Sequence, residues 1–384
     1  MSAISLTLKA GNHERRHCPV SVVVETPPGQ GVAVLKNAAG QPVPHQCRPL
    51  GQGKVQVSWI VDFLAVGQST SYQAELGPDC EAAGSGVEVQ DRPGERIDVC
   101  IGGQLFTSYY YASSYARPFF YPLIGPHGDS VTRHYPMQEL PDERHDHPHH
   151  RSLWVAHGDV NGVDNWSELE GHGRILQREV CALHGGPVFG HLCTHNDWVS
   201  PAGQKVVSEH RCVKIYHLPS QVRLIDFDIT FTATEGDVKF GDTKEGGIVS
   251  VRVASSMDVP VGGRITNSYN GLNEAETWGK RAHWCAYAGP VKGNLVGIAV
   301  FDHPTSFRHP TYWHVRDYGL MTANCFGLSH FHNDPNLDGS YVLPAGKSLH
   351  FAYRVYIHSG DTVAGRVGER YHDYVNPPQI TVES

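Results

Sequence analysis

The chain has 384 residues, of which 40% are hydrophobic, and it contains 41 glycines and 25 prolines. This composition is typical of a globular, turn-rich protein that can bury a large core. The formal net charge of −8 and the lack of any run of lysine or arginine argue against a nucleic-acid-binding surface.

Hydropathy and the cysteines predict the compartment. The longest strongly apolar runs, such as residues 295–301, are far shorter than the roughly 20 residues that a membrane-spanning helix needs. Residues 1–8 lack the basic region and long apolar segment of a signal peptide. The nine cysteines are widely spaced, and none forms a Cys-x-x-Cys pair. We therefore expect a cytoplasmic protein with no membrane span, no disulfide framework and no cysteine-type zinc site.

Apolar and polar residues alternate along most of the chain. In residues 222–232, for example, Ile225, Phe227, Ile229 and Phe231 share one face. The other strand-like segments are residues 20–25, 55–61, 96–101, 174–183, 206–216, 248–254, 296–301 and 350–358. Gly, Pro, Asn and Asp separate these segments, and one polar face per segment favours antiparallel sheets. We predict an all-β fold, a large antiparallel β-sandwich.

A change in composition predicts a domain boundary within residues 80–95. We expect a small N-terminal β region over residues 1–85 and a main sandwich domain, carrying the site, over residues 95–384. The alternative is one continuous super-sandwich with this loop at its edge. A short C-terminal helix should begin at Asp361 or Thr362 and end before Pro377. Its docking stripe would comprise Val363, Val367, Tyr371 and Tyr374.

Two neighbouring segments suggest a ligand site. Residues 117–129 combine aromatic residues and prolines with Arg117, which fits a ligand-facing loop as well as a core strand. Residues 145–157 contain five histidines, ahead of the turn signal at Asn161. Histidine is the commonest metal ligand, and Pro148 favours an extended backbone in which alternate imidazoles point the same way. This pattern predicts a metal site or a set of hydrogen-bond partners for a sugar; a solvated histidine-rich loop is the alternative.

Two later segments carry further polar groups. Glu245 lies in a Lys-Glu-Gly-Gly sequence before an apolar strand, where a general base can approach a ligand with little steric hindrance, although a charged hairpin turn has the same pattern. Residues 301–327 contain His303, His314 and Arg316, and an ion pair between Arg316 and Asp317 is the structural alternative for that dipeptide. We expect Glu245 and the histidine segment to face the same cavity.

Several catalytic motifs are absent from the sequence. The chain has no P-loop, no G-x-G-x-x-G fingerprint, no H-E-x-x-H and no G-x-S-x-G. These absences argue against NTP hydrolysis, a Rossmann dehydrogenase, a zincin and an α/β-hydrolase. We expect no nucleotide cofactor.

Taken together, these segments resemble the PmoA-like family of soluble bacterial proteins, labelled after a methane-oxygenase subunit. The resemblance rests on the motifs at residues 147–162, 244–247 and 301–327, in the same order, and covers roughly residues 95–360. A methane monooxygenase subunit of that type is membrane-embedded, which this chain is not expected to be. The resemblance instead implies carbohydrate catabolism. At the level of the fold the chain is also similar to galactose-mutarotase-like super-sandwiches, which place His and Glu around a sugar ring.

We therefore predict an enzyme, a carbon–oxygen lyase or an isomerase, that removes a proton next to the carbonyl of a 3-keto-glycoside, leading to β-elimination or isomerisation. The expected catalytic residues are Glu245 as the base, His150 and His303. The expected substrate-binding residues are Arg117, Trp154, Asn161, Arg252, Trp313, His314, Arg316 and Asn324. His147, His149 and His157 would bind a divalent metal ion, zinc or manganese.

Two other functions fit the same residues. One is a metal-free aldose mutarotase or epimerase with a His acid and a Glu base, and the other is a non-catalytic carbohydrate-binding protein. In each case we expect a small-molecule sugar as ligand, no nucleic acid or membrane as partner, and a homo-oligomer as one quaternary state open to the chain.

Overall fold

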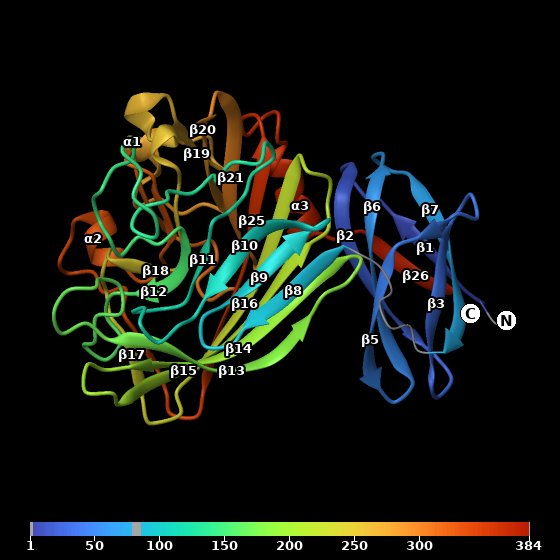
Figure 1. Ribbon diagram of the computed structural model, residues 1–384, viewed down its shortest axis with the longest axis horizontal. Coiled ribbons are helices and arrows are strands. Elements are labelled where there is room, and N and C mark those ends of the chain that lie inside the picture. The colour runs from blue at the N-terminus through green and yellow to red at the C-terminus, as the bar shows by residue number, and fades with distance from the viewer. Residues whose placement is uncertain (1–2, 79–85, 384) are drawn as a thin grey trace.

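Two β-sandwich units of unequal size lie side by side, with the C-terminal helix between them (Figure 1). The computed structural model describes residues 3–78 and 86–383, so residues 80–85 of the expected boundary region lie outside the described residues. Within the described residues, no helix has both the length and the apolar character needed to cross a membrane.

The small unit consists of two sheets around its own apolar core, which includes the buried Trp59. One sheet has the strand order β26-β1-β7-β3-β4 and the other β2-β6-β5. The strands are β1 (Ala3–Lys9), β2 (Arg15–Glu25), β3 (Gln30–Asn37), β4 (Pro42–Val43), β5 (His45–Gly51), β6 (Lys54–Leu64), β7 (Ser69–Pro78) and β26 (Gln379–Glu383). Because β26 pairs with β1, the chain returns to the small unit after the large one. The expected division assigned all of residues 95–384 to the main domain and so did not include this return.

The large unit packs two eight-stranded antiparallel sheets face to face. The first large sheet contains, in order across the sheet, β22 (Trp313–Arg316), β23 (Leu320–Ala323), β18 (Gly246–Arg252), β12 (Leu153–His157), β11 (Phe119–Tyr121), β10 (Gln104–Tyr110), β9 (Arg96–Ile101) and β8 (Val87–Arg92). The second large sheet contains β13 (Arg174–His184), β14 (Phe189–Val199), β15 (Lys205–Tyr216), β16 (Val222–Thr232), β25 (Ser348–Ser359), β21 (Asn294–Asp302), β20 (Trp284–Val291) and β19 (Arg264–Asn267).

The remaining elements are short. They are the pair β17 (Val238–Phe240) and β24 (Tyr341–Leu343), the helices α1 (Asn273–Thr277), α2 (Leu328–His332) and α3 (Val367–Val375), and two 3-10 helices (Ser255–Met257 and Val259–Val261).

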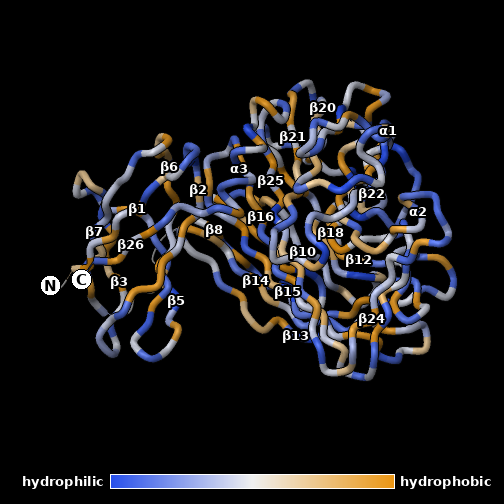
Figure 2. The backbone as a smooth tube through the Cα atoms, turned by 180° about the vertical axis from the view of Figure 1, so that it is seen from behind, coloured by the Kyte–Doolittle hydropathy of each residue, from blue (hydrophilic) through white to orange (hydrophobic). Residues whose placement is uncertain are grey.

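The predicted antiparallel sandwich is therefore confirmed, and its core lies between the two large sheets. Ile225, Phe227, Ile229 and Phe231 all point into this core, as their alternation predicted. Figure 2 shows hydrophobic stretches within strands of both units. The face of each large sheet that points away from this core is called its outer face below.

Helix α3 begins later than predicted. Asp361 does accept hydrogen bonds from the backbone N–H groups of Val363 at 3.0 Å and Ala364 at 2.8 Å. These bonds stabilise a turn that precedes the helix, and they do not cap the helix itself. Arg366 then takes a left-handed conformation with φ of 50°, and α3 starts at Val367. The expected docking stripe is accordingly wrong at Val363, which is 81% exposed. Val367 and Tyr371 do dock, in an apolar cluster on the outer face of the second large sheet.

This arrangement predicts unequal effects of two valine substitutions. Val367→Ala should lower the free energy of unfolding by about 1.6 kcal/mol, because two buried methyl groups are lost at about 0.8 kcal/mol each. Val363→Ala, at the exposed position, should change it by less than about 0.5 kcal/mol. Urea unfolding of both variants checks the difference. Equal effects would mean that the helix does not dock as described.

One disulfide corrects the expectation drawn from the cysteine count. Cys193 on β14 and Cys212 on β15 lie directly opposite each other in the antiparallel register and are bonded, with a Cα–Cα distance of 4.1 Å. The odd count of nine concealed this pair, because neighbouring strands bring together cysteines that are 19 positions apart.

Candidate active site

The part of the histidine segment that precedes β12 lies on the outer face of the first large sheet. This face carries an apolar cluster that includes Phe119, Trp154 and Trp166. The ring of His150 stacks on that of Trp154, with 5.4 Å between the ring centroids, and lies edge-on to that of Trp166 at 5.5 Å. The segment is therefore anchored on the sheet, and the alternative of a merely solvated loop does not hold.

Asp146 links two buried arginines beneath this site. Its Oδ1 accepts a hydrogen bond from Arg133 Nη1 at 2.6 Å and another from Arg252 Nη2 at 2.8 Å. Both guanidinium groups are fully buried, so the carboxylate compensates two charges that water does not reach. Burial alone would raise the pKa of Asp146, but Arg252 and Arg133 outweigh it and hold this pKa below its usual value.

His150 and His149 are neutral at physiological pH. Arg252 Nη1 donates to His150 Nδ1 at 3.1 Å, which leaves the imidazole proton of the neutral ring on Nε2. Burial, together with the neighbouring His149 and Arg252, lowers the pKa of His150 well below its usual value. Burial and the guanidinium of Arg117 lower the pKa of His149 to about 4. Neutral rings of this kind can donate or accept one hydrogen bond but cannot act as cations.

His147, a partly exposed histidine of the segment, stacks on a tyrosine ring. Its ring lies parallel to that of Tyr318, with 5.1 Å between centroids, and the guanidinium carbon of Arg252 lies 4.9 Å from the same phenol ring. Burial raises the pKa of Tyr318, and the negative charge of Glu245 contributes to the increase. The phenol thus lies within electrostatic reach of both the histidine segment and Glu245.

Glu245 precedes β18 on a loop that Asn324 fixes. The Asn324 amide donates to the backbone oxygen of Thr243 at 2.9 Å and to that of Lys244 at 3.3 Å. The Glu245 side chain is 49% exposed and pairs with Lys244 at 3.4 Å. Lys244 also contributes, after burial and Arg316, to lowering the pKa of His314 to about 3. His314 accepts a hydrogen bond from Trp278 Nε1 at 3.0 Å on the outer face.

The outer face therefore gathers partly exposed polar groups around Tyr318. A carboxylate (Glu245), an imidazole (His147) and a phenol can exchange protons, whereas Lys244 and Arg316 can stabilise developing negative charge. Arg316 also pairs with Glu274 at 3.2 Å rather than with Asp317, so the ion pair that was the structural alternative for that dipeptide is not formed. The rings of Tyr318 and Trp278 provide apolar surface beside these groups. Such a set suits a polyhydroxylated ligand with one reactive carbon.

His303 does not belong to this site. It lies at the end of β21, beside a cavity of about 280 Å³ on the outer face of the second large sheet, with Asp228, His350 and Tyr374. The whole thickness of the sandwich separates it from Glu245. The prediction that His303 is catalytic in the same site as Glu245 and His150 is therefore wrong.

The three expected metal ligands do not converge. His157 points into the core, where its Nε2 lies 3.0 Å from the backbone oxygen of Gly241 and its ring lies 4.9 Å from that of Phe326. His147 and His149 lie on the opposite face of the sheet. Two imidazoles remain there as candidate ligands, and a metal requirement for this face stays a prediction.

Most of the expected sugar-binding residues are structural. Trp313 is fully buried between the sheets and donates to the backbone oxygen of Ala282 at 2.9 Å. Arg117 is buried and donates to the backbone oxygens of Trp166 and Ser167. Trp154 supports His150 from below, and Asn324 and Arg252 position the groups described above. Asn161 is exposed, but its side chain bonds the backbone around β17, accepting from Lys239 N at 2.6 Å.

Four residues of this face were not assigned to the site from the sequence. They are Asp146, Lys244, Trp278 and Tyr318. Asp146 and Lys244 were visible within the two motifs, flanking His147 and Glu245. Tyr318 lies in the turn between β22 and β23, and only the pairing of β23 with β18 brings it over Arg252.

Comparison with known families gives one match. The model of a family of unknown function (DUF6807) matches residues 96–372, which is most of the chain and includes every residue of the candidate site. The chain belongs to this family. Its description assigns no activity, so the predicted resemblance to PmoA-like proteins stays a prediction. No match was found among curated proteins.

Two solved structures are distant neighbours of this family member. An alpha-mannosidase from Enterococcus faecalis V583 is 10% identical, with a TM-score of 0.49; the match covers 100% of this chain but 46% of the mannosidase. A galactose mutarotase related enzyme from Lactobacillus acidophilus is 8% identical, with a TM-score of 0.25, over 71% of this chain and 97% of that enzyme. The chain thus spans less than half the length of the mannosidase.

Proposed function

We propose that the protein is a carbohydrate-active enzyme that removes a proton from the carbon next to the carbonyl of an oxidised sugar, a 3-keto-glycoside. The observation that carries this proposal is the position of Glu245. Its carboxylate is half exposed, is held on a fixed loop, and lies within electrostatic reach of the Tyr318 phenol on which His147 stacks.

In this reaction the Glu245 carboxylate takes the proton from C2 of the sugar. The electron pair left on C2 delocalises onto the C3 oxygen as an enolate, near the cationic Lys244 and Arg316. In elimination the enolate re-forms the carbonyl and expels the oxygen at C1, which takes a proton from an acid on the same face. His147, the partly exposed imidazole that stacks on Tyr318, is the candidate acid. In isomerisation the enolate is reprotonated instead.

Exchange of the C2 proton tests the first step independently of the fate of the enolate. The protein is incubated with a 3-keto-glucoside in deuterated buffer, and the C2 proton signal is followed by NMR. We expect loss of this signal much faster than in buffer alone. Release of the group at C1 with exchange identifies elimination, whereas exchange with the glycoside intact identifies isomerisation.

Other outcomes contradict the proposal. If the protein interconverts the anomers of a free aldose, as followed by polarimetry, but catalyses no C2 exchange, it is a mutarotase that uses the same His and Glu groups. If it binds the sugar and catalyses neither process, it is a carbohydrate-binding protein. Each of these results would replace proton abstraction as the function of this face.

A further inference from the structure

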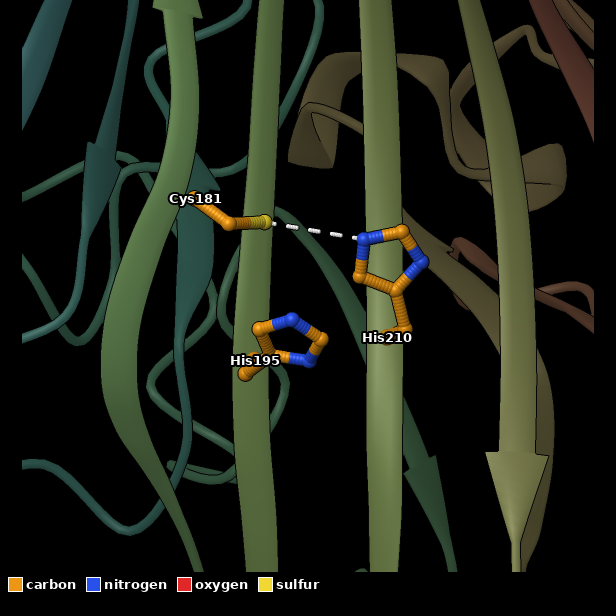
Figure 3. A group of neighbouring side chains, drawn as sticks. All are labelled: Cys181, His195 and His210. Atoms are coloured by element: carbon orange, nitrogen blue, oxygen red, sulfur yellow. Dashed lines mark hydrogen bonds between the residues drawn. The ribbon is translucent and has the colours of Figure 1, made fainter.

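A second group of reactive side chains lies on the outer face of the second large sheet, on the other side of the sandwich from the candidate active site. Strands β13, β14 and β15 run side by side there and contribute Cys181, His195 and His210, respectively. His195 and His210 are directly opposite each other in the antiparallel register. Cys181 lies in the irregularity between Val180 and Ala182, where β13 shifts register against β14. Figure 3 shows the three side chains on the same face of the sheet.

The spacing within this group suits a bound metal ion, and one of its distances matches tetrahedral geometry. One ligand atom from each residue lies within 4.8 Å of the other two, and Cys181 Sγ is 3.6 Å from His210 Nε2. Zinc binds thiolate at about 2.3 Å and imidazole at about 2.0–2.1 Å, and at the tetrahedral angle these bond lengths place sulfur and nitrogen about 3.6 Å apart. We propose that Cys181, His195 and His210 bind a zinc ion.

The choice of zinc follows from the donor atoms. A thiolate with two imidazoles is a soft to borderline set that suits zinc, whereas magnesium, calcium and manganese prefer oxygen ligands. Asp228, which lies opposite Cys212 on the neighbouring strand, raises the affinity of this region for positive charge, and its effect is felt at His210. Because three protein ligands occupy three tetrahedral positions, the fourth position faces solvent and would hold water.

The nearby disulfide determines which sulfur binds the metal. Cys212 Sγ lies 3.7 Å from His210 Nε2, about as close as that of Cys181, but it is bonded to Cys193. A sulfur in a disulfide is not a thiolate and is a poor ligand for zinc. Cys181 is free and exposed, so its sulfur is the one that is available to bind the metal. The three strands carry the ligands on one hydrogen-bonded sheet, and little reorganisation is needed on binding.

Zinc titration of the full chain tests this site. The protein is stripped with a chelator, dialysed without a thiol reductant so that the disulfide stays intact, and titrated calorimetrically with zinc chloride. We expect one zinc ion per chain. Cobalt, used as a spectroscopic substitute, should give a thiolate-to-cobalt charge-transfer band together with the visible bands of a tetrahedral ion.

Two variants and one matched control locate the ligands. Cys181→Ser and His195→Asn should each weaken zinc binding by more than the roughly 10–100-fold that the loss of an outer-shell partner costs. Cys181→Ser should also lose the charge-transfer band of bound cobalt. Cys100→Ser removes a free, partly buried cysteine from the first large sheet and should leave affinity and spectrum unchanged.

A thermal measurement keeps the test decisive if one variant folds poorly. Zinc should raise the melting temperature of the unmodified protein and of Cys100→Ser, but not that of whichever ligand variant folds. The proposal is overturned if the unmodified protein binds less than one equivalent of zinc. It is also overturned if the Cys181→Ser variant binds as tightly as the control, or if bound cobalt shows no thiolate band.

Discussion

Replacing Asp146 by Asn should lower the free energy of unfolding at pH 7 by about 3 kcal/mol, the lower end of the range for removing one partner of a buried ion pair. The reason is that Arg133 and Arg252 are both fully buried and share one carboxylate oxygen, so the variant removes the anion that pairs directly with both guanidinium groups. The lower end applies because the carboxylate itself is 35% exposed. Urea unfolding followed by circular dichroism measures the change.

The same substitution has a defined dependence on pH. The pKa of Asp146 is lower in the folded protein than in the unfolded chain, so its contribution to stability is present above the unfolded pKa and is lost as pH falls through the folded pKa. The difference between the unmodified protein and Asp146→Asn should therefore be constant near neutral pH and shrink below about pH 4.

A surface carboxylate provides the control for Asp146. Asp228, like Asp146, pairs with a basic partner, and the distance to His350 is 3.1 Å. In contrast to Asp146, its side chain is 61% exposed. Asp228→Asn should change stability by less than about 0.5 kcal/mol, as is usual for surface substitutions. If Asp146→Asn proved equally harmless, the two buried arginines would be compensated by other groups and the described network would not be what holds the segment.

Replacing Glu245 by Gln should lower the rate of C2 proton exchange by roughly 100- to 10,000-fold, the contribution typical of a positioned general base. The amide keeps the size of the side chain but cannot accept the proton. The melting temperature should stay nearly unchanged, because the carboxylate is half exposed and forms only a surface pair with Lys244. NMR exchange rates and thermal unfolding of the same samples provide the two readouts.

The matched control for Glu245 is Glu235. This glutamate is also exposed and pairs with a lysine, Lys205, at 2.8 Å, but it lies in the turn after β16, away from the candidate active site. Glu235→Gln should leave the exchange rate unaffected. Full activity in Glu245→Gln would remove this residue from the mechanism, and a large fall in its melting temperature would mean that the carboxylate is structural.

Sequence patterns predicted the strands well because alternation is a local property. The segment 222–232 coincides with β16, and the segment 206–216 differs from β15 by one residue. The residues that alternate in these segments do divide between the core and the outer face. Packing of an apolar face requires this pattern wherever the strand lies in the sheet, so no knowledge of the neighbours was needed.

The site was harder to predict, because alternation does not say to which sheet a strand belongs. His303 and His314 are close in sequence, but β21 and β22 lie in different sheets, and the two histidines face opposite sides of the sandwich. Trp313 and His314 illustrate the second difficulty. Both are aromatic neighbours on one short strand, and only the position of the core shows that Trp313 is interior and His314 is on the outer face. The sheet order assigns each strand to a sheet, and the position of the core then shows which residues of the strand face outward.

The disulfide and the proposed zinc site of Cys181, His195 and His210 were missed for a related reason. Motifs for cysteine sites rely on short spacings such as Cys-x-x-Cys. Here the partners lie on neighbouring strands of a meander, where residues that are far apart in sequence stand opposite each other. Given the register of β13, β14 and β15, both groups follow directly from the sequence.

The return of β26 to the small unit affects the order in which the protein can fold on the ribosome. Residues 3–78 leave the ribosome first, but β1 keeps an unpaired edge until residues 379–383 have been made, after the whole large unit. An open edge of this kind can pair with another nascent chain. Fast folding of the large unit, followed by rapid docking of the segment after α3, would shorten the time for which this edge is exposed. Cutting the chain between the two units would not yield two complete domains, because the fragment that contains β1 would lack β26.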